Sequence, residues 1–146
     1  MAGSRHAAHA HAAHVHNKRI LVVEDNPLNM KLFSAMIAAE GYEVLQARDG
    51  LRGIELAHRQ HPDLIILDIQ LPGMSGLEVT QNLKADAETH DIPIIATTAF
   101  ATRSDEETIL ACGCDAYMAK PIAISQFLEL IASFMSSAAH PEALPA

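Results

Sequence analysis

The sequence predicts a doubly wound α/β domain, in which helices cover both faces of a five-stranded parallel sheet. Two continuous apolar runs, 20–23 and 64–67, are typical of strands that are buried on both faces. Segments with the apolar spacing of helices lie between the strand candidates, so strands and helices alternate along the chain. Such alternation requires right-handed crossover connections, which build a parallel sheet.

The first helix candidate has the clearest boundaries. Asn26 is a favourable N-cap residue, Pro27 suits the first helical position, and Gly41 suits the turn that ends a helix. Between them, the residues of a predicted apolar stripe are Leu28, Leu32, Ala35, Met36 and Ala39. Similar patterns give the other elements: the strand candidates are 20–23, 42–47, 64–67, 92–97 and 115–118, and the further helix candidates are 51–59, 77–84, 104–111 and 125–135.

The chain has the length and the apolar content of one ordinary domain, with 146 residues of which 49% are hydrophobic. We expect this domain to span 18–136. We also expect a His/Ala-rich tag or disordered leader at 1–17 and a flexible tail at 137–146. The net charge of −8 argues against a nucleic-acid-binding protein with a basic face.

The location of the protein is expected to be the cytoplasm. No apolar run approaches the roughly 20 residues that span a bilayer, and the N-terminus lacks the apolar core of a signal peptide. The only cysteines, Cys112 and Cys114, fit a reducing compartment. They lack further ligands at zinc spacing, so we interpret them as small apolar residues near a helix end.

Charged and hydroxyl side chains follow the predicted ends of four strands. In a parallel α/β sheet, ligands bind beyond the carboxyl ends of the strands, at the point where the strand order reverses. Five side chains are expected to converge there: Glu24 and Asp25 after the first strand, Asp68 after the third, Thr98 after the fourth and Lys120 after the fifth.

Each of these residues also has an ordinary structural role open to it. Asp25 is able to cap the helix that begins near Pro27, and Asp68 is able to begin the turn that Pro72 continues. Turns and caps do not explain, however, why acids end two strands and a lysine ends another. The joint pattern therefore favours a chemical role.

Three carboxylates at one edge of a sheet favour the binding of a cation. Two unit charges about 4 Å apart repel by roughly 4 kcal/mol at an effective dielectric near 20, so crowded carboxylates bind a metal ion or a proton. Oxygen ligands with an open side suit Mg²⁺, and Lys120 adds a point charge for a phosphate oxygen. A carboxylate nucleophile, Mg²⁺ and a lysine together predict a phosphoryl-transfer site.

Four motifs of the chain resemble the signature positions of response-regulator receiver domains. They are Val23–Asn26, Asp68–Gly76, Thr98–Ala99 and Lys120–Pro121, in the order and at the spacing of that family. The resemblance covers about 18–135 and implies a flavodoxin-like fold with strand order 2-1-3-4-5. It also implies a phosphorylation-dependent switch of a two-component phosphorelay, whose partners are a histidine kinase or a histidine phosphotransfer protein.

The resemblance assigns roles to the acidic residues. It implies that Asp68 is the phospho-acceptor and that Asp25, Asp68 and the main-chain carbonyl of Gln70 bind Mg²⁺. Glu24 is implied to act on the metal ion through water.

The resemblance also implies a switch. Thr98 and Lys120 hold the phosphoryl oxygens, and the Lys120–Pro121 peptide is cis. On phosphorylation Thr98 turns inward, and Tyr117 moves into the space that it leaves. A protein target then reads the surface formed by the helix after Thr98, the fifth strand and the last helix.

Further segments are similar to single-domain receivers of the DivK type, which regulate bacterial cell division. These segments are Asn26–Phe33, Gly76–Thr80, Thr98–Ala101 and Asp105–Glu107. Such receivers have no output domain and act by binding histidine kinases. Because the chain ends shortly after its last predicted helix, we expect it to carry no DNA-binding domain.

Two other functions stay open at this point. The chain is also consistent with a receiver domain excised from a hybrid histidine kinase, because Glu24–Asn26 resembles those modules too. A Mg²⁺-dependent aspartyl phosphatase is disfavoured, since such enzymes place a second acid two residues after the nucleophile, where this chain has Gln70. We therefore expect a switch and not a turnover enzyme.

Overall fold

The computed structural model of the protein describes residues 18–139, with side chains up to 136. The predicted leader at 1–17 lies outside the described residues, as do residues 140–146 of the predicted tail. Five parallel strands form one sheet in the order β2-β1-β3-β4-β5, which confirms the predicted fold class. The strands are β1 (Arg19–Val23), β2 (Glu43–Ala47), β3 (Leu64–Asp68), β4 (Ile94–Thr98) and β5 (Ala116–Ala119), and the helices are α2 (Pro27–Ala39), α3 (Gly50–Gln60), α4 (Gly76–Lys84), α5 (Arg103–Ala111) and α6 (Ile124–Ala139).

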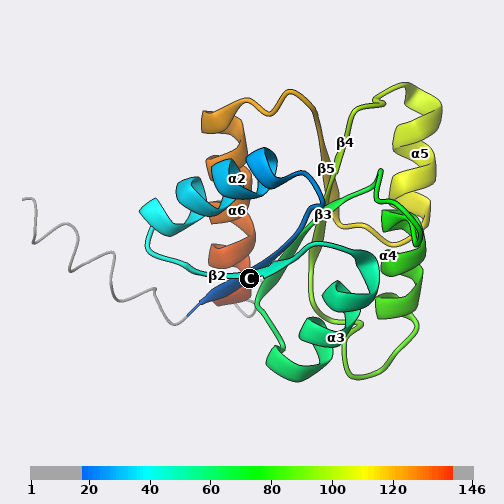
Figure 1. The fold of residues 1–146 in the computed structure, drawn as a ribbon, viewed down its shortest axis with the longest axis horizontal. Helices are drawn as coiled ribbons and strands as arrows, with labels where there is room; N and C mark the ends of the chain where they lie inside the picture. The colour runs from blue at the N-terminus through cyan, green and yellow to red at the C-terminus, as the bar shows by residue number, and fades with distance from the viewer. Residues whose placement is uncertain (1–17, 140–146) are drawn as a thin grey trace, which may run out of the picture.

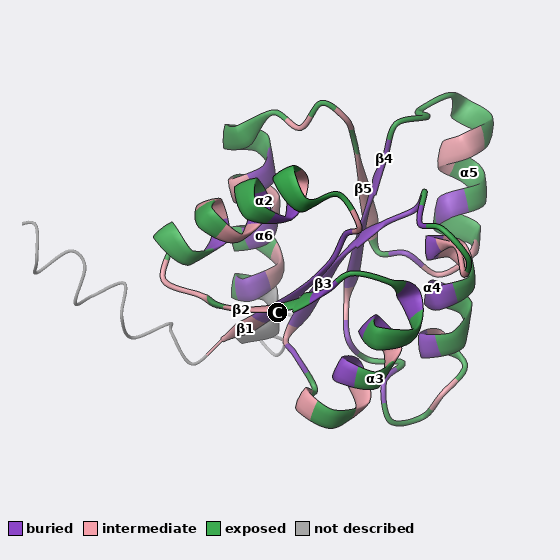
Figure 2. Cartoon of the chain, in the orientation of Figure 1, coloured by how far each residue is buried: buried purple, intermediate pink, exposed green. Residues whose placement is uncertain are grey.

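The helices form two layers on opposite faces of the sheet (Figure 1). Helices α2 and α6 cover one face, and helices α3, α4 and α5 cover the other. All five residues of β3 and all five of β4 are buried, as Figure 2 shows for the centre of the sheet. Burial on both faces explains why Leu64–Leu67 and Ile94–Ala96 are continuous apolar runs and lack the alternation of a half-exposed strand.

The predicted apolar stripe of α2 was wrong. The buried residues of this helix are Met30, Phe33 and Ile37, whereas Leu28 is 64% exposed and Leu32 is 51% exposed. Helix α2 carries apolar residues around most of its circumference, so a helical period fits more than one stripe. The contact with α6 decides which stripe is buried, because the ring of Phe33 packs 5.3 Å from the ring of Phe127.

The helix ends agree with the local sequence. The side chain of Asn26 caps α2 by accepting a hydrogen bond from Asn29 N, and Gly41 follows the helix with a φ of 97°. Helix α4 starts with a capping box between Ser75 and Glu78. Helix α6 extends to Ala139, beyond the predicted 125–135.

The two cysteines have no partner cysteine among the described residues. Both thiols are free, and burial raises the pKa of the Cys114 thiol. In the described part of the chain, no helix combines the length and the apolar character that a membrane span requires.

Candidate phosphoryl-transfer site

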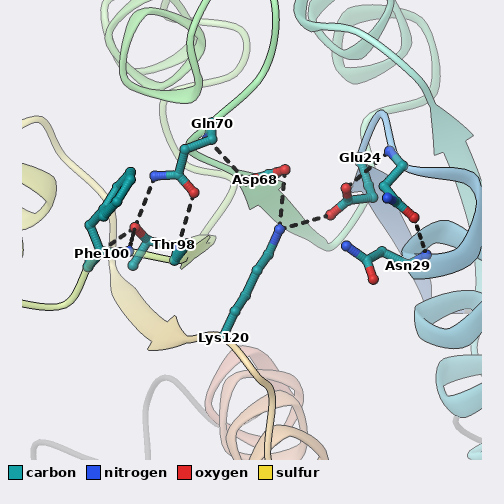
Figure 3. Close-up of polar contacts among 9 residues, drawn as sticks. Glu24, Asn29, Asp68, Gln70, Thr98, Phe100 and Lys120 are labelled. Atoms are coloured by element: carbon teal, nitrogen blue, oxygen red, sulfur yellow. Dashed lines mark hydrogen bonds and ion pairs between the residues drawn. The ribbon is translucent and has the colours of Figure 1, made fainter.

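The structure brings the predicted site residues together at the carboxyl edge of the sheet (Figure 3). Glu24 and Asp25 follow β1, Asp68 ends β3, Thr98 ends β4, and Lys120 follows β5. Strand β2 lies on one side of β1 and β3 lies on the other, so the strand order reverses between β1 and β3. The connections after these two strands separate there and leave space for a ligand.

Three carboxylates are crowded at this point. One oxygen from each of Glu24, Asp25 and Asp68 lies within 4.8 Å of the others. Glu24 is only 1% exposed and Asp68 only 3%, so their charges are poorly hydrated. Burial raises the pKa of Glu24, and the neighbouring Asp68 charge raises it further, although the backbone N–H of Asn26 and the Lys120 ammonium oppose this shift.

A lysine offsets part of this negative charge. The Nζ of Lys120 lies 3.2 Å from Asp68 Oδ2 and 3.5 Å from Glu24 Oε1. The backbone N–H of Lys120 donates to Thr98 O at 2.7 Å, which fixes the start of the side chain beside the end of β4. The Lys120–Pro121 peptide is cis, as the resemblance implies.

The donor set fits a hard divalent cation. The three carboxylates provide only oxygen ligands, and two of them are buried with a single ammonium group between them. Mg²⁺ prefers such ligands and binds through a few carboxylates while it keeps several waters. The Asp25 carboxylate is not needed for the cap of α2, because Asn26 supplies that cap.

The Thr98 hydroxyl is hydrogen-bonded to Phe100 and Gln70 in this structure. It donates to Phe100 O at 2.9 Å and accepts hydrogen bonds from Phe100 N and from Gln70 Nε2, each at 3.0 Å. The family resemblance assigned a role to the main-chain carbonyl of Gln70, and the sequence showed only that its side chain is not an acid. The contacts of this side chain with Thr98 and Ala99 were missed. The only signal for them is the position of Gln70, two residues after Asp68.

Tyr117 lies on the same face of the sheet as Thr98. In the parallel pairing of β4 and β5, Tyr117 is opposite Ala96 and Thr98 is opposite Ala119. The Tyr117 ring is half-buried against the core under α3, α4 and α5. Burial raises the pKa of the Tyr117 hydroxyl, and the nearby Glu106 carboxylate raises it further.

Gly76 is a second residue whose importance the sequence did not reveal. It begins α4 and donates its N–H to Ile69 O. A Cβ atom at this position would lie 2.4 Å from Asp68 O and 2.7 Å from Ile69 Cα, both of them backbone atoms. The absence of a side chain at Gly76 therefore lets α4 pack directly against the backbone that carries Asp68.

Among residues 18–139, one other group of side chains has the composition of a metal site, namely His58, Asp86 and Glu88. Asp86 Oδ2 faces His58 Nε2 at 3.5 Å, whereas Glu88 Oε1 faces His58 Nδ1 at 3.4 Å. The two carboxylates thus approach different nitrogens of the ring. This arrangement does not gather the two carboxylates around one nitrogen of the ring.

Residues 20–132 match the family described as the response regulator receiver domain. The chain belongs to this family. The polar-differentiation response regulator DivK of Brucella ovis is 54% identical over 121 residues, which are 83% of this chain and 98% of that protein. DivK of Brucella anthropi is 53% identical over the same share of both chains. These similarities confirm that the chain is a receiver of the DivK type.

Solved receiver structures have the same fold. The receiver domain of the sensor histidine kinase PA1611 from Pseudomonas aeruginosa PAO1 is 35% identical, with a TM-score of 0.77 over 82% of this chain and 98% of that one. That structure contains a magnesium ion coordinated in its active-site cleft. The chemotaxis protein CheY4 of Vibrio cholerae, at 24% identity and a TM-score of 0.76, covers 80% of this chain and 98% of its own and shares the fold.

The substitution Asp25→Asn tests the carboxylate cluster. We expect it to raise the metal-free free energy of unfolding by about 1 kcal/mol, because one of three crowded charges is removed from a half-buried position. It should also weaken Mg²⁺ binding by about tenfold or more, since a neutral amide replaces a charged oxygen ligand. Urea unfolding with chelator and with Mg²⁺ measures both effects. A clear loss of metal-free stability would contradict this interpretation.

Proposed function

We propose that this receiver is a phosphorylation-dependent switch of a two-component phosphorelay, with Asp68 as its phospho-acceptor. One observation carries the proposal: the buried Asp68 carboxylate lies 3.2 Å from the Lys120 ammonium and beside two further acids at the carboxyl edge of the sheet. A carboxylate in this setting has a cation to offset the negative charge of a transferred phosphoryl group.

In the proposed reaction, a carboxylate oxygen of Asp68 forms a bond to the phosphorus of a phosphohistidine, and the phosphorus–nitrogen bond breaks. The bonding electrons stay on the imidazole, which takes up a proton from water. Lys120, already in contact with Asp68, offsets the charge on the transferred oxygens. Thr98 reaches a phosphoryl oxygen once its hydroxyl leaves the carbonyl of Phe100.

A Mg²⁺ ion fits the acidic cluster. Asp25, Asp68 and the main-chain carbonyl of Gln70 would hold it, with Glu24 acting through water. When bound, the ion supplies positive charge to the phosphoryl oxygens during transfer.

The phosphorylated form is proposed to be the output of the protein and not an intermediate of a turnover enzyme. Gln70 stands two residues after Asp68, and its amide offers no general acid for the release of a small product. Phosphorylation of Asp68 is therefore proposed to change a surface that partner proteins bind. With a DivK-type sequence, we infer that this output serves the control of cell division in the cytoplasm.

The phosphodonor is proposed to bind beside α2. A groove of about 270 Å³ between α2 and the β5–α6 connection has an apolar lining that includes Leu32, Phe33 and Ile122, and Lys120 lines it as well. Leu32 and Ile124 at this groove are 51% and 58% exposed. Because the groove reaches Lys120, a histidine kinase or phosphotransfer protein seated there brings its phosphohistidine close to Asp68.

The downstream target is proposed to bind the surface of α5, β5 and α6. An open hollow there is lined by Ala101 before α5, by Tyr117 on β5 and by Gln126 on α6. Thr98 is followed directly by the connection that leads to α5, so a movement of Thr98 changes this surface. Phosphorylation at Asp68 is thereby coupled to the affinity for a target.

Chemical phosphorylation tests the proposed function. Acetyl phosphate with Mg²⁺ is expected to add one phosphoryl group to the wild type and none to Asp68→Asn, as measured by intact mass. The matched control is Asp91→Asn, which removes an exposed acid on the connection before β4 and should leave the modification unchanged. Hydroxylamine should remove the added mass, because it cleaves an acyl phosphate. Equal modification of wild type and Asp68→Asn would overturn the assignment.

A further inference from the structure

The side chain of Gln70 connects two loops of the site, the one after β3 and the one after β4. Its Nε2 donates to Thr98 Oγ1 at 3.0 Å, and its Oε1 accepts from Ala99 N at 3.0 Å. Figure 3 shows this amide directed toward Thr98, on the opposite side of Asp68 from Glu24. One amide group thus binds two consecutive residues at the point where β4 ends.

These contacts use the full hydrogen-bonding capacity of the Thr98 hydroxyl. A hydroxyl has one proton to donate and two lone pairs to accept with. The proton of Thr98 goes to Phe100 O, and the lone pairs accept from Phe100 N and Gln70 Nε2. The hydroxyl therefore has no free donor for a phosphoryl oxygen while this arrangement lasts.

Gln70 is also tied to the phospho-acceptor. Its backbone N–H donates to Asp68 Oδ1 at 2.9 Å, so the same residue contacts the reacting carboxylate and the Thr98 hydroxyl. A phosphoryl group added to Asp68 changes the charge and the space next to this backbone. Gln70 is therefore placed to respond to phosphorylation at one end and to hold Thr98 at the other.

We propose that Gln70 is a positioning residue that holds Thr98 and the β4–α5 connection in the resting state, and that its amide releases them when Asp68 is phosphorylated. This inference rests on the proposed function. It predicts that loss of the Gln70 side-chain amide favours the switched state, which is the conformation that phosphorylation of Asp68 favours. Glutamine suits this role because one end of its amide donates and the other accepts, whereas glutamate retains only the acceptors.

Two substitutions separate the two contacts. Gln70→Met removes both hydrogen bonds, and Gln70→Glu keeps an acceptor for Ala99 N but offers no donor to Thr98. Because Gln70 is exposed, neither substitution leaves a cavity in the core. The first measurement is amide hydrogen exchange at Ala99 in the unphosphorylated protein. We expect it to speed up by about tenfold in Gln70→Met and to change by less than about twofold in Gln70→Glu.

The second measurement is the affinity for beryllofluoride, a stable mimic of the phosphoryl group, in the presence of Mg²⁺. We expect Gln70→Met to bind it about three- to tenfold more tightly than the wild type, because the resting state has lost contacts that the switched state does not make. In the background Thr98→Val, the same Gln70→Met change should tighten binding less than it does in the wild type, because the amide has already lost its hydroxyl partner and keeps only the contact with Ala99 N. This dependence on Thr98 separates positioning of the hydroxyl from a general loosening of the loop.

The two measurements test different parts of the proposal. Unchanged exchange at Ala99 in Gln70→Met would overturn the positioning role, whatever happens at Asp68. An affinity that is unchanged or weaker in Gln70→Met would overturn the proposed sign. Absence of beryllofluoride binding to the wild type would overturn the proposed phospho-acceptor function, while the exchange measurement would still decide whether the amide holds the loop.

Discussion

Replacing Lys120 with methionine is expected to lower the metal-free free energy of unfolding by about 2–3 kcal/mol. The substitution leaves two buried carboxylates, Asp68 and Glu24, without the only cation within 4 Å of them among the described residues. Breaking a buried ion pair from one side typically costs about 3–5 kcal/mol. The Lys120 side chain is 21% exposed, so solvent weakens its ion pairs. The expected loss of stability therefore lies at or below the lower end of that range.

Excess Mg²⁺ should restore most of this loss, because the ion supplies the charge that lysine supplied. At a free Mg²⁺ concentration of 100 times the dissociation constant, binding raises the free energy of unfolding by about 2.7 kcal/mol. The measurement is urea unfolding of Lys120→Met and wild type, each with chelator and with Mg²⁺. Lys31→Met, which removes an exposed lysine from α2, is the matched control and should change stability by no more than about 0.5 kcal/mol. Equal stability of Lys120→Met and wild type in chelator would show that the ion pairs of Lys120 make no net contribution to the free energy of unfolding.

Replacing Gly76 with alanine is expected to destabilise the fold by about 3 kcal/mol. Helix propensity alone predicts the opposite, since alanine is more favourable than glycine in a helix by about 0.5–1 kcal/mol. The new Cβ, however, would lie 2.4 Å from Asp68 O and 2.7 Å from Ile69 Cα. Both neighbours are backbone atoms, so α4 must move away from β3, and overpacking of this kind costs about 1–3 kcal/mol or more.

The matched control is Gly73→Ala, in the loop that leads to α4. Gly73 has a φ of +74°, and apart from Gly73 itself and its two chain neighbours, no residue comes within 4 Å of the position that its Cβ would take. Its substitution should cost only about 1–2 kcal/mol, from the left-handed backbone conformation. Urea unfolding ranks the two variants, and the rate of modification by acetyl phosphate should fall in Gly76→Ala alone. A Gly76→Ala protein as stable as wild type would mean that α4 shifts without cost.

The fold could be predicted from the sequence because the sheet is buried on both faces. The central strands then begin with continuous apolar runs, as in Leu64–Leu67 and Ile94–Ala96, and helices are marked by caps such as Asn26. The buried face of α2 could not be predicted in the same way. Its choice depends on the contact between Phe33 and Phe127, which are far apart in the sequence.

The same distinction applies to the site. Charged residues at strand ends such as Asp68 and Lys120 can be recognised from the sequence, because the topology of a parallel sheet brings those ends to one edge. The bridging amide of Gln70 cannot, since glutamine at an exposed loop position is common and its partners follow another strand. The need for glycine at position 76 is hidden for a similar reason, because only the packing of α4 on β3 creates it.

The contact between Lys120 and Glu24 has a consequence for how the protein is made. These residues are separated by 96 positions, and the contact connects the start of the domain to its last strand. A ribosome exposes Glu24 and Asp68 long before it exposes Lys120, so a nascent or truncated chain contains the proposed acceptor aspartate without its cation. Under the proposed function, we therefore expect a chain to become competent for phosphorylation only when the domain is complete. Unfinished chains would then not compete with finished ones for the donor.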